Sequence, residues 1–221
     1  MPRISTKESL EHFKKHNQDK DCSVKHCDSK RAGVSKYCSR HQRNNWRYGD
    51  PLARRIFPQE MEVERSKCEH VVKYNKEHPA IDNGIDYFNQ WMINSANEIP
   101  GISATEHFQR LHDDGVTGEE LLIEAATVYM FQRNNPDELP EHQPRPLMMA
   151  IGLAVLGYRQ LKPDDPNYRN YISELRIEPK KRREVGRIIW RDLGSLIVRI
   201  AREIEEHDKG MDVKGKLIIK K

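Results

Sequence analysis

The chain has 221 residues, of which 33% are charged and 36% hydrophobic, and its mean hydropathy is −0.88. The opening segment MPRISTKESLEHFKKH is polar, unlike a signal peptide, and the longest apolar run, Leu147–Tyr158, is shorter than the roughly 20 residues that span a bilayer. We therefore expect a soluble, cytoplasmic protein with no membrane partner, in which cysteines remain reduced.

Charge is distributed unevenly along the chain, whose net charge is +4. Residues 1–57 contain 14 Lys and Arg against 6 Asp and Glu, a net charge of +8. Residues 58–178 carry −10 and residues 179–221 carry +6. Basic ends and an acidic middle indicate an anionic partner for the ends, with chance clustering of surface charge as the alternative.

The pattern along the chain is helical at nearly every position outside one cysteine-rich stretch. A short helix is expected near residues 5–15, where Ser5 and Glu8 form a capping box, and the cysteine-rich module covers about 20–56. Apolar spacing and helix-ending Pro and Gly residues then predict helices at 60–78, 81–97, 103–115, from 117 onward, 147–158 and 184–207. No internal repeat is visible.

Several of these segments have distinctive features. Thr117 and Glu120 form a second capping box, and residues 134–146 are a proline-rich acidic linker or long loop. Residues 147–158 are apolar on all sides, which predicts a buried central helix, and the closing KGKLIIKK could be a frayed tail or an edge strand. The last helix has one apolar stripe, made of Ile189, Leu193, Leu196, Ile200 and Ile204.

The expected fold is therefore mainly α, with two domains. Residues 1–57 form an N-terminal metal-binding module, and residues 58–221 form a helical bundle that ends in a basic helix and tail.

Three of the four cysteines lie within seventeen residues and a histidine follows them, in the spacing Cys22-x4-Cys27-x10-Cys38-x2-His41. Structural Zn²⁺ sites use four thiolate and imidazole ligands in a tetrahedron. Cys22 and Cys27 can lie on a tight turn, and Cys38 and His41 on the first turn of a helix that ends near Gly49. We expect these four residues to bind one Zn²⁺.

Other candidate ligands are weaker. His26 lies next to Cys27 but could replace a cysteine only by distorting the turn. His12 and His16 have helical i, i+4 spacing, which is more typical of solvated residues, and Cys68 is expected to be an isolated buried thiol in the following helix. None of these is included in the expected site.

The segment AGVSKYCSRHQRNNWRYGDPL resembles the small treble-clef-type zinc modules of bacteriophage and mobile-element proteins. The resemblance covers about 35 residues within 20–56, and the matching positions are Cys22, Cys27, Tyr37, Cys38, His41, Arg43, Trp46, Arg47, Tyr48, Gly49, Asp50 and Pro51. It implies a zinc site and a DNA-related role, because such modules often accompany an HNH-type nuclease or a DNA-binding region.

An HNH-type nuclease also needs a histidine base and a second residue to hold its catalytic cation. No Asp-His or His-His pair occurs after Pro51, and the remaining candidates are His107, His112, Asp113 and Asp114 at the end of an expected helix. Polar residues at a helix end need no catalytic explanation. We therefore expect a protein that does not hydrolyse DNA with Mg²⁺ or Mn²⁺.

Basic residues surround the expected zinc site and can contact phosphates or guanine edges. The candidates for nucleic-acid contact are Lys25, Lys30, Arg31, Lys36, Arg40, Arg43, Arg47, Arg54 and Arg55. Trp46 and Tyr48 could stack on bases, although we expect Trp46 to form the small core of the module instead. The basic run 180–183, before the last helix, is either a second phosphate contact or a solvated helix start.

These patterns favour a non-catalytic, zinc-containing regulatory protein of phage or mobile-element type that binds nucleic acid, DNA rather than RNA. One alternative is an anti-defence inhibitor or adaptor that binds a host nucleic-acid enzyme, with the acidic residues 58–178 imitating nucleic acid. The other is an HNH-type endonuclease.

Overall fold

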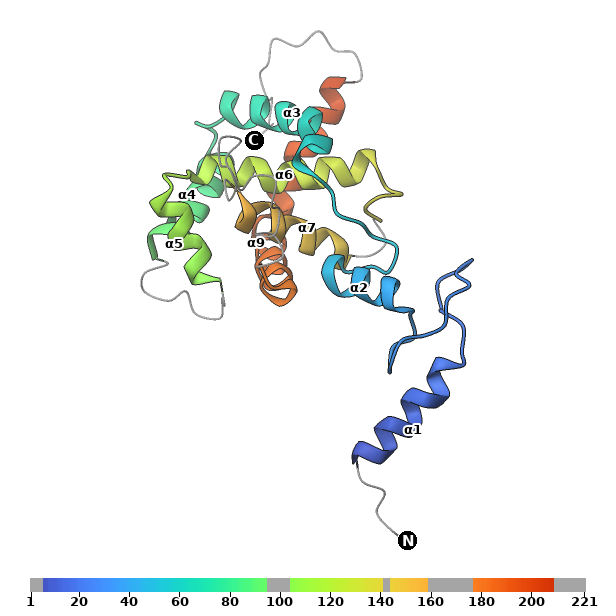
Figure 1. The fold of residues 1–221 in the computed structure, drawn as a ribbon. Helices are drawn as coiled ribbons and strands as arrows, with labels where there is room; N and C mark the ends of the chain where they lie inside the picture. Colours follow the sequence, from blue (N-terminus) through green and yellow to red (C-terminus); the bar gives the residue numbers. More distant parts are fainter. Residues whose placement is uncertain (1–5, 95–103, 141–143, 159–176, 209–221) are drawn as a thin grey trace, which may run out of the picture. The chain divides into compact units, whose positions relative to one another are not determined.

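The computed structural model describes residues 6–94, 104–140, 144–158 and 177–208, and the chain divides into two compact units, Met1–Arg55 and Ile56–Lys221 (Figure 1). The first unit contains helices α1 (Thr6–Gln18) and α2 (Ser39–Tyr48). The second contains the short 3₁₀ helix η1 (Pro58–Met61) and helices α3 (Glu62–Tyr74), α4 (Pro79–Asn94), α5 (Thr105–Asp113), α6 (Gly118–Asn134), α7 (Pro144–Gly157) and α9 (Pro179–Asp208). The mainly α fold is confirmed, because helices and no β-strand occur in the described residues.

The first unit has a very small apolar core. Its buried members are Cys22, Val24 and Cys38, and the partly buried Cys27 and Tyr37 pack against them. Asn17, near the end of α1, is buried and its amide donates to the carbonyl oxygens of Gly33 (2.8 Å) and Ser35 (2.7 Å). Side-chain hydrogen bonds, rather than apolar packing alone, therefore attach α1 to the loop before α2.

Helix α6 lies at the centre of the second unit, where it contacts α3, α4, α7 and α9 (Figure 1). Every residue from Leu121 to Val128 is buried. The helix begins with the capping box predicted from sequence: Glu120 N–H donates to Thr117 Oγ1 at 3.3 Å, and Thr117 N–H donates to Glu120 Oε2 at 2.8 Å. That prediction is confirmed.

The helix expected to be central is placed differently. Helix α7 covers most of residues 147–158 but begins at Pro144, and it is buried on one side while Met148, Leu153 and Ala154 are only half-buried. The helix that is buried on all sides is α6. Its polar residues Glu124 and Gln132 are tolerated there because both form hydrogen bonds inside the unit. Paired polar side chains can lie in a core that unpaired ones would destabilise.

The last helix, α9, contains the predicted apolar stripe, and all five of its residues are buried. The helix begins at Pro179, so the basic run 180–183 lies in its first turn and not before it. Arg182 in that run is 3% exposed and is not a surface phosphate contact.

Expectations for Ser5, for the start at residue 103 and for the closing KGKLIIKK lie outside the described residues. None of the helices that the structure describes combines the length and apolarity that crossing a bilayer requires.

Candidate metal centre

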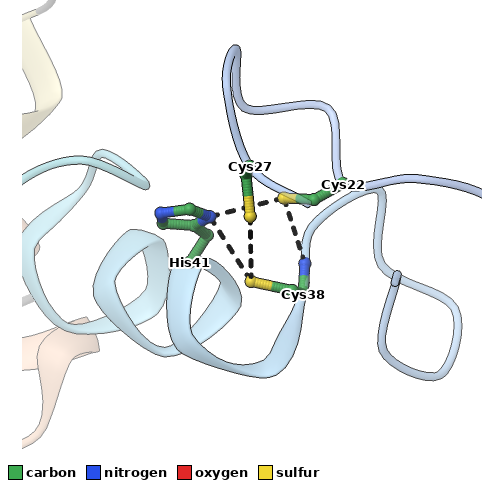
Figure 2. A group of neighbouring side chains, drawn as sticks. All are labelled: Cys22, Cys27, Cys38 and His41. Carbon is green, nitrogen blue, oxygen red and sulfur yellow. Dashed lines mark hydrogen bonds between the residues drawn. The ribbon is translucent and has the colours of Figure 1, made fainter. Parts of the chain in front are cut away.

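The four predicted ligands lie together in the first unit (Figure 2). The Nδ1 atom of His41 is 3.3 Å from Cys22 Sγ and 3.4 Å from Cys38 Sγ, and Cys27 Sγ is 3.9 Å from Cys38 Sγ. All four ligand atoms lie within 4.8 Å of one another. The cysteines are free thiols, so the arrangement is compatible with a bound metal ion.

The segment between Cys22 and Cys27 is a tight turn that brings both sulfurs to the same side. Cys27 N–H donates to Val24 O at 3.2 Å, and His26 adopts a left-handed conformation with φ of 60°. Cys22 N–H donates to Ser29 O at 3.0 Å, which closes the base of the loop beside the Asp21–Lys30 bridge. Backbone hydrogen bonds therefore fix the first two ligands.

Helix α2 supplies the other two ligands. Cys38 is its N-cap residue, with extended backbone angles (φ −67°, ψ 167°), and its main-chain N–H donates to Cys22 Sγ at 3.3 Å. His41 is three residues later, on the buried side of the first turn, with 4% of its surface exposed. At its other end α2 stops at Gly49, whose φ of 88° is the left-handed conformation in which glycine is favoured.

The surroundings of the thiols separate their pKa values. Burial by itself raises the pKa of Cys22, but main-chain hydrogen bonds from Val24 and Cys38 and a bond with His41 outweigh burial and lower the pKa to about 6. At Cys27 a main-chain hydrogen bond with Ser29 lowers the pKa, whereas burial and the neighbouring thiols raise it, and the net shift is upward. The lowered pKa favours the thiolate form of Cys22, which is the form that binds metal ions.

The competing ligands lie elsewhere. His26 is exposed and is not part of the cluster, and His12 and His16 are exposed on α1. Cys68 is fully buried in α3, and burial raises its pKa to about 12. Within the described ranges, the Cys₃His cluster is the one group of three or more metal-ligating side chains.

The nine basic candidates have different surroundings. Arg31 donates to Asp21 O at 2.9 Å and to Ser23 Oγ at 3.2 Å, and Lys30 forms an ion pair with Asp21 at 2.7 Å. These two side chains hold the loop together. Lys36 lies 5.1 Å from the centre of the Tyr37 ring.

The remaining candidates are Lys25, the α2 arginines Arg40, Arg43 and Arg47, and Arg54 and Arg55. Arg54 donates to Arg55 O at 2.8 Å. Lys25, Arg40 and Arg43 are exposed, and Arg47 is half-buried. Helix α2 contains no acidic residue, so its arginines have no carboxylate partner on their own helix. Helix α2 therefore carries three arginines and no acidic residue, and no ion pair of these arginines occurs within the described part of the chain.

The expectation that Trp46 forms the core of the module is wrong. Trp46 is 59% exposed, and Tyr37 is the aromatic residue that packs against the buried cysteines. The side chain of Asn44 donates to Pro51 O at 3.4 Å, so it supports the turn after α2. Tyr48 is half-buried.

The residues considered for catalysis do not converge. His107 is half-buried and its Nε2 lies 3.6 Å from Glu106, which also pairs with Lys181. His112 is exposed beside Asp113, and Asp114 pairs with Arg110 at 3.0 Å. These side chains form separate surface contacts and no metal-ligating group.

Asn17 was missed by sequence reasoning. The sequence signal for Asn17 is weak. It lies four positions after Phe13 and seven after Leu10, on the same side of α1, but this spacing predicts burial only if that side of the helix has a partner.

Comparisons with protein-family models, with curated proteins and with solved structures found no significant match for this chain.

Proposed function

We propose that the chain binds one Zn²⁺ through Cys22, Cys27, Cys38 and His41. Zn–S bonds of about 2.3 Å and Zn–N bonds of about 2.0 Å in a tetrahedron place sulfurs about 3.8 Å apart and sulfur and nitrogen about 3.5 Å apart. The Cys27–Cys38 separation of 3.9 Å and the two Sγ–Nδ1 separations of 3.3 and 3.4 Å have this geometry. A closed set of four protein ligands supports a structural ion and not a catalytic one.

The function that this site supports best is binding of nucleic acid, DNA rather than RNA, without hydrolysis, in a regulatory protein of the treble-clef type found in phages and mobile elements. The observation that carries the proposal is the outer face of α2. Arg40, Arg43 and Arg47 lie on a helix that has no acidic residue and is fixed from its other side by His41. Guanidinium groups held in this way can pair with phosphate oxygens.

The test is a titration of a labelled DNA duplex with the full chain at several salt concentrations. Roughly three to five phosphate contacts predict that log affinity falls with log salt at a slope of about −3 to −4.5. Replacing Arg43 and Arg47 together by Ala should flatten the slope by up to two contacts and leave zinc content unchanged. The matched control is the double change Arg199→Ala with Arg202→Ala, which removes two exposed arginines from α9.

The two double variants have the same net charge, so they separate a specific surface from general attraction. If both weaken binding equally, the α2 face is not the binding surface. If the wild-type chain binds neither duplex nor single-stranded nucleic acid even at low salt, nucleic-acid binding is wrong, and the arginines face a protein partner, such as a host enzyme, or only water.

A further inference from the structure

Trp46 is the large aromatic residue on the outer face of α2, and it lies outside the apolar cluster of the first unit. The small core around the cysteines contains Tyr37, while 59% of the Trp46 surface remains exposed. Isolated exposed apolar residues are ordinary. An exposed indole on a helix that carries three arginines and no carboxylate is a more specific combination.

Helical geometry places these side chains on one surface. At 3.6 residues per turn, Trp46 is about 60° around α2 from Arg43 and about 100° from Arg47. The same geometry places Trp46 about 140° and Arg43 about 160° from His41, which faces the metal cluster (Figure 2). The indole and the guanidinium groups therefore point outward together, away from the metal ligands.

We propose that Trp46 stacks on an unpaired base of a single-stranded nucleic acid whose neighbouring phosphates pair with Arg43 and Arg47. This inference rests on the proposed nucleic-acid binding and adds the form of the ligand. In a duplex, each base face is covered by the next base pair, so a tryptophan on a rigid helix has no ring face to contact. A single strand offers those faces, and aromatic stacking with electrostatic contact is how sequence-tolerant single-strand binders work.

The charge of the surface favours this ligand over an apolar protein partner. Burying Trp46 against an apolar surface would also remove nearby arginines from water without a counter-charge. A strand provides a ring to stack on and an anionic phosphate on each side of it. A protein with an acidic rim is the competing partner, and the experiment below separates it from a strand.

The experiment measures binding of the full chain to fluorescein-labelled dT12, to rU12 and to a 12-base-pair hairpin duplex. Trp46→Ala should weaken binding to the single strands by about 5- to 150-fold. It should leave the salt slope and the duplex affinity unchanged, because the phosphate contacts remain. Trp46→Phe, which keeps an aromatic ring, should retain most of the affinity. Leu52→Ala is the control, because it removes a different exposed apolar side chain (69% exposed), and it should retain all of the affinity.

Fluorescence provides a second measurement. Trp91 and Trp190 lie in the second unit, so quenching of tryptophan emission by dT12 should disappear in Trp46→Phe while binding persists. Preference for dT12 or for rU12 identifies the strand as DNA or RNA, and both outcomes support stacking. Equal loss on strands and duplex, or no loss on either, would overturn the inference while nucleic-acid binding stands. Absence of wild-type binding to all three probes would overturn both proposals and favour the protein partner.

Discussion

Gly186 of α9 lies directly against the main-chain carbonyl of Met148 in α7. A Cβ atom built on Gly186 would be 1.7 Å from that oxygen, and one built on Gly152 of α7 would be 1.9 Å from the carbonyl oxygen of Arg182 in α9. The two glycines face each other's helices in a reciprocal arrangement. Because backbone atoms cannot move aside as a flexible side chain can, α7 and α9 can approach this closely only with glycine at both positions.

Gly186→Ala should therefore destabilise the second unit by about 3 kcal/mol, because an added methyl forces the two helices apart. Urea unfolding followed by fluorescence in a Trp46→Phe background reports on Trp91 and Trp190, both in this unit. The control is Gly157→Ala at the end of α7, where a Cβ would meet only side-chain atoms at 3.8 and 3.9 Å. Equal stability of the two variants would show that the helices do not meet at Gly186.

A buried ion pair connects α3 to the central helix. Arg65 Nη2 donates to Glu124 Oε2 at 2.8 Å, its Nε lies 2.7 Å from Oε1, and the Glu124 side chain is only 5% exposed. Burial raises the pKa of Glu124, and the charge and hydrogen bond of Arg65 oppose that rise. The charged form of the buried Glu124 carboxylate is therefore stabilised by Arg65.

Arg65→Met should destabilise the second unit by about 3–5 kcal/mol at neutral pH, because it leaves a carboxylate buried without a counter-charge. The cost should shrink as the pH falls and Glu124 becomes neutral. Combining Arg65→Met with Glu124→Leu should recover most of the loss. Urea unfolding of the wild type, both single variants and the double variant gives the coupling free energy between the two side chains. If the two single losses of stability simply add up in the double variant, the ion pair contributes nothing.

The Cys₃His cluster could be predicted from sequence because the information that forms it is largely local. Cys38 and His41 share one helical turn, and Cys22 and Cys27 share one tight turn, so spacing alone brings each pair together. The position of α6 could not be predicted in this way. Glu124 looks like a solvent-facing residue until its partner, 59 positions earlier in the chain, is known.

Trp46 is the converse case, an apolar residue whose exposure could not be predicted from local sequence. Large aromatic residues are usually buried, which predicted a core position. In this small module, however, the apolar cluster consists of the three cysteines, Val24 and Tyr37, and Trp46 is not part of it. Whether a residue is needed in a core depends on the volume left to fill, and local sequence does not contain that volume.

The surroundings of His107 predict a pH dependence of stability. Burial lowers its pKa below the ordinary value of 6.5, Lys181 and Arg110 lower it further, and Glu106 opposes them. Since the unfolded chain then binds the proton more tightly than the folded chain, stability should decrease as the pH falls below about 6.5. His107→Gln should reduce this decrease.

Urea unfolding across the pH range from 7.5 down to about 5 measures the effect. The control is His112→Gln on the same helix, where the side chain is exposed. Parallel pH profiles for the wild type and His107→Gln would show that His107 is not the group responsible.

The last prediction concerns the metal itself. Chain purified without chelator should contain one zinc per molecule by elemental analysis. Cys38→Ser should lose it, because a serine hydroxyl cannot replace the Cys38 thiolate among the four proposed ligands. Metal binding of this kind contributes on the order of 10 kcal/mol to folding, and in the described residues of this unit the apolar cluster has just three buried members, Cys22, Val24 and Cys38. The first unit should therefore become sensitive to protease while the second unit unfolds at an unchanged urea concentration.

Cys68→Ser is the matched control, since it changes the one cysteine outside the cluster. It should keep the zinc and destabilise the second unit by about 1–3 kcal/mol, because a hydroxyl replaces a fully buried thiol. The two substitutions thus predict opposite patterns of zinc loss and stability loss. Zinc should also dissociate as the pH falls, because protons compete with the metal for the thiolates. Wild-type chain without zinc, or zinc retained in Cys38→Ser, would show that these four side chains are not the ligands.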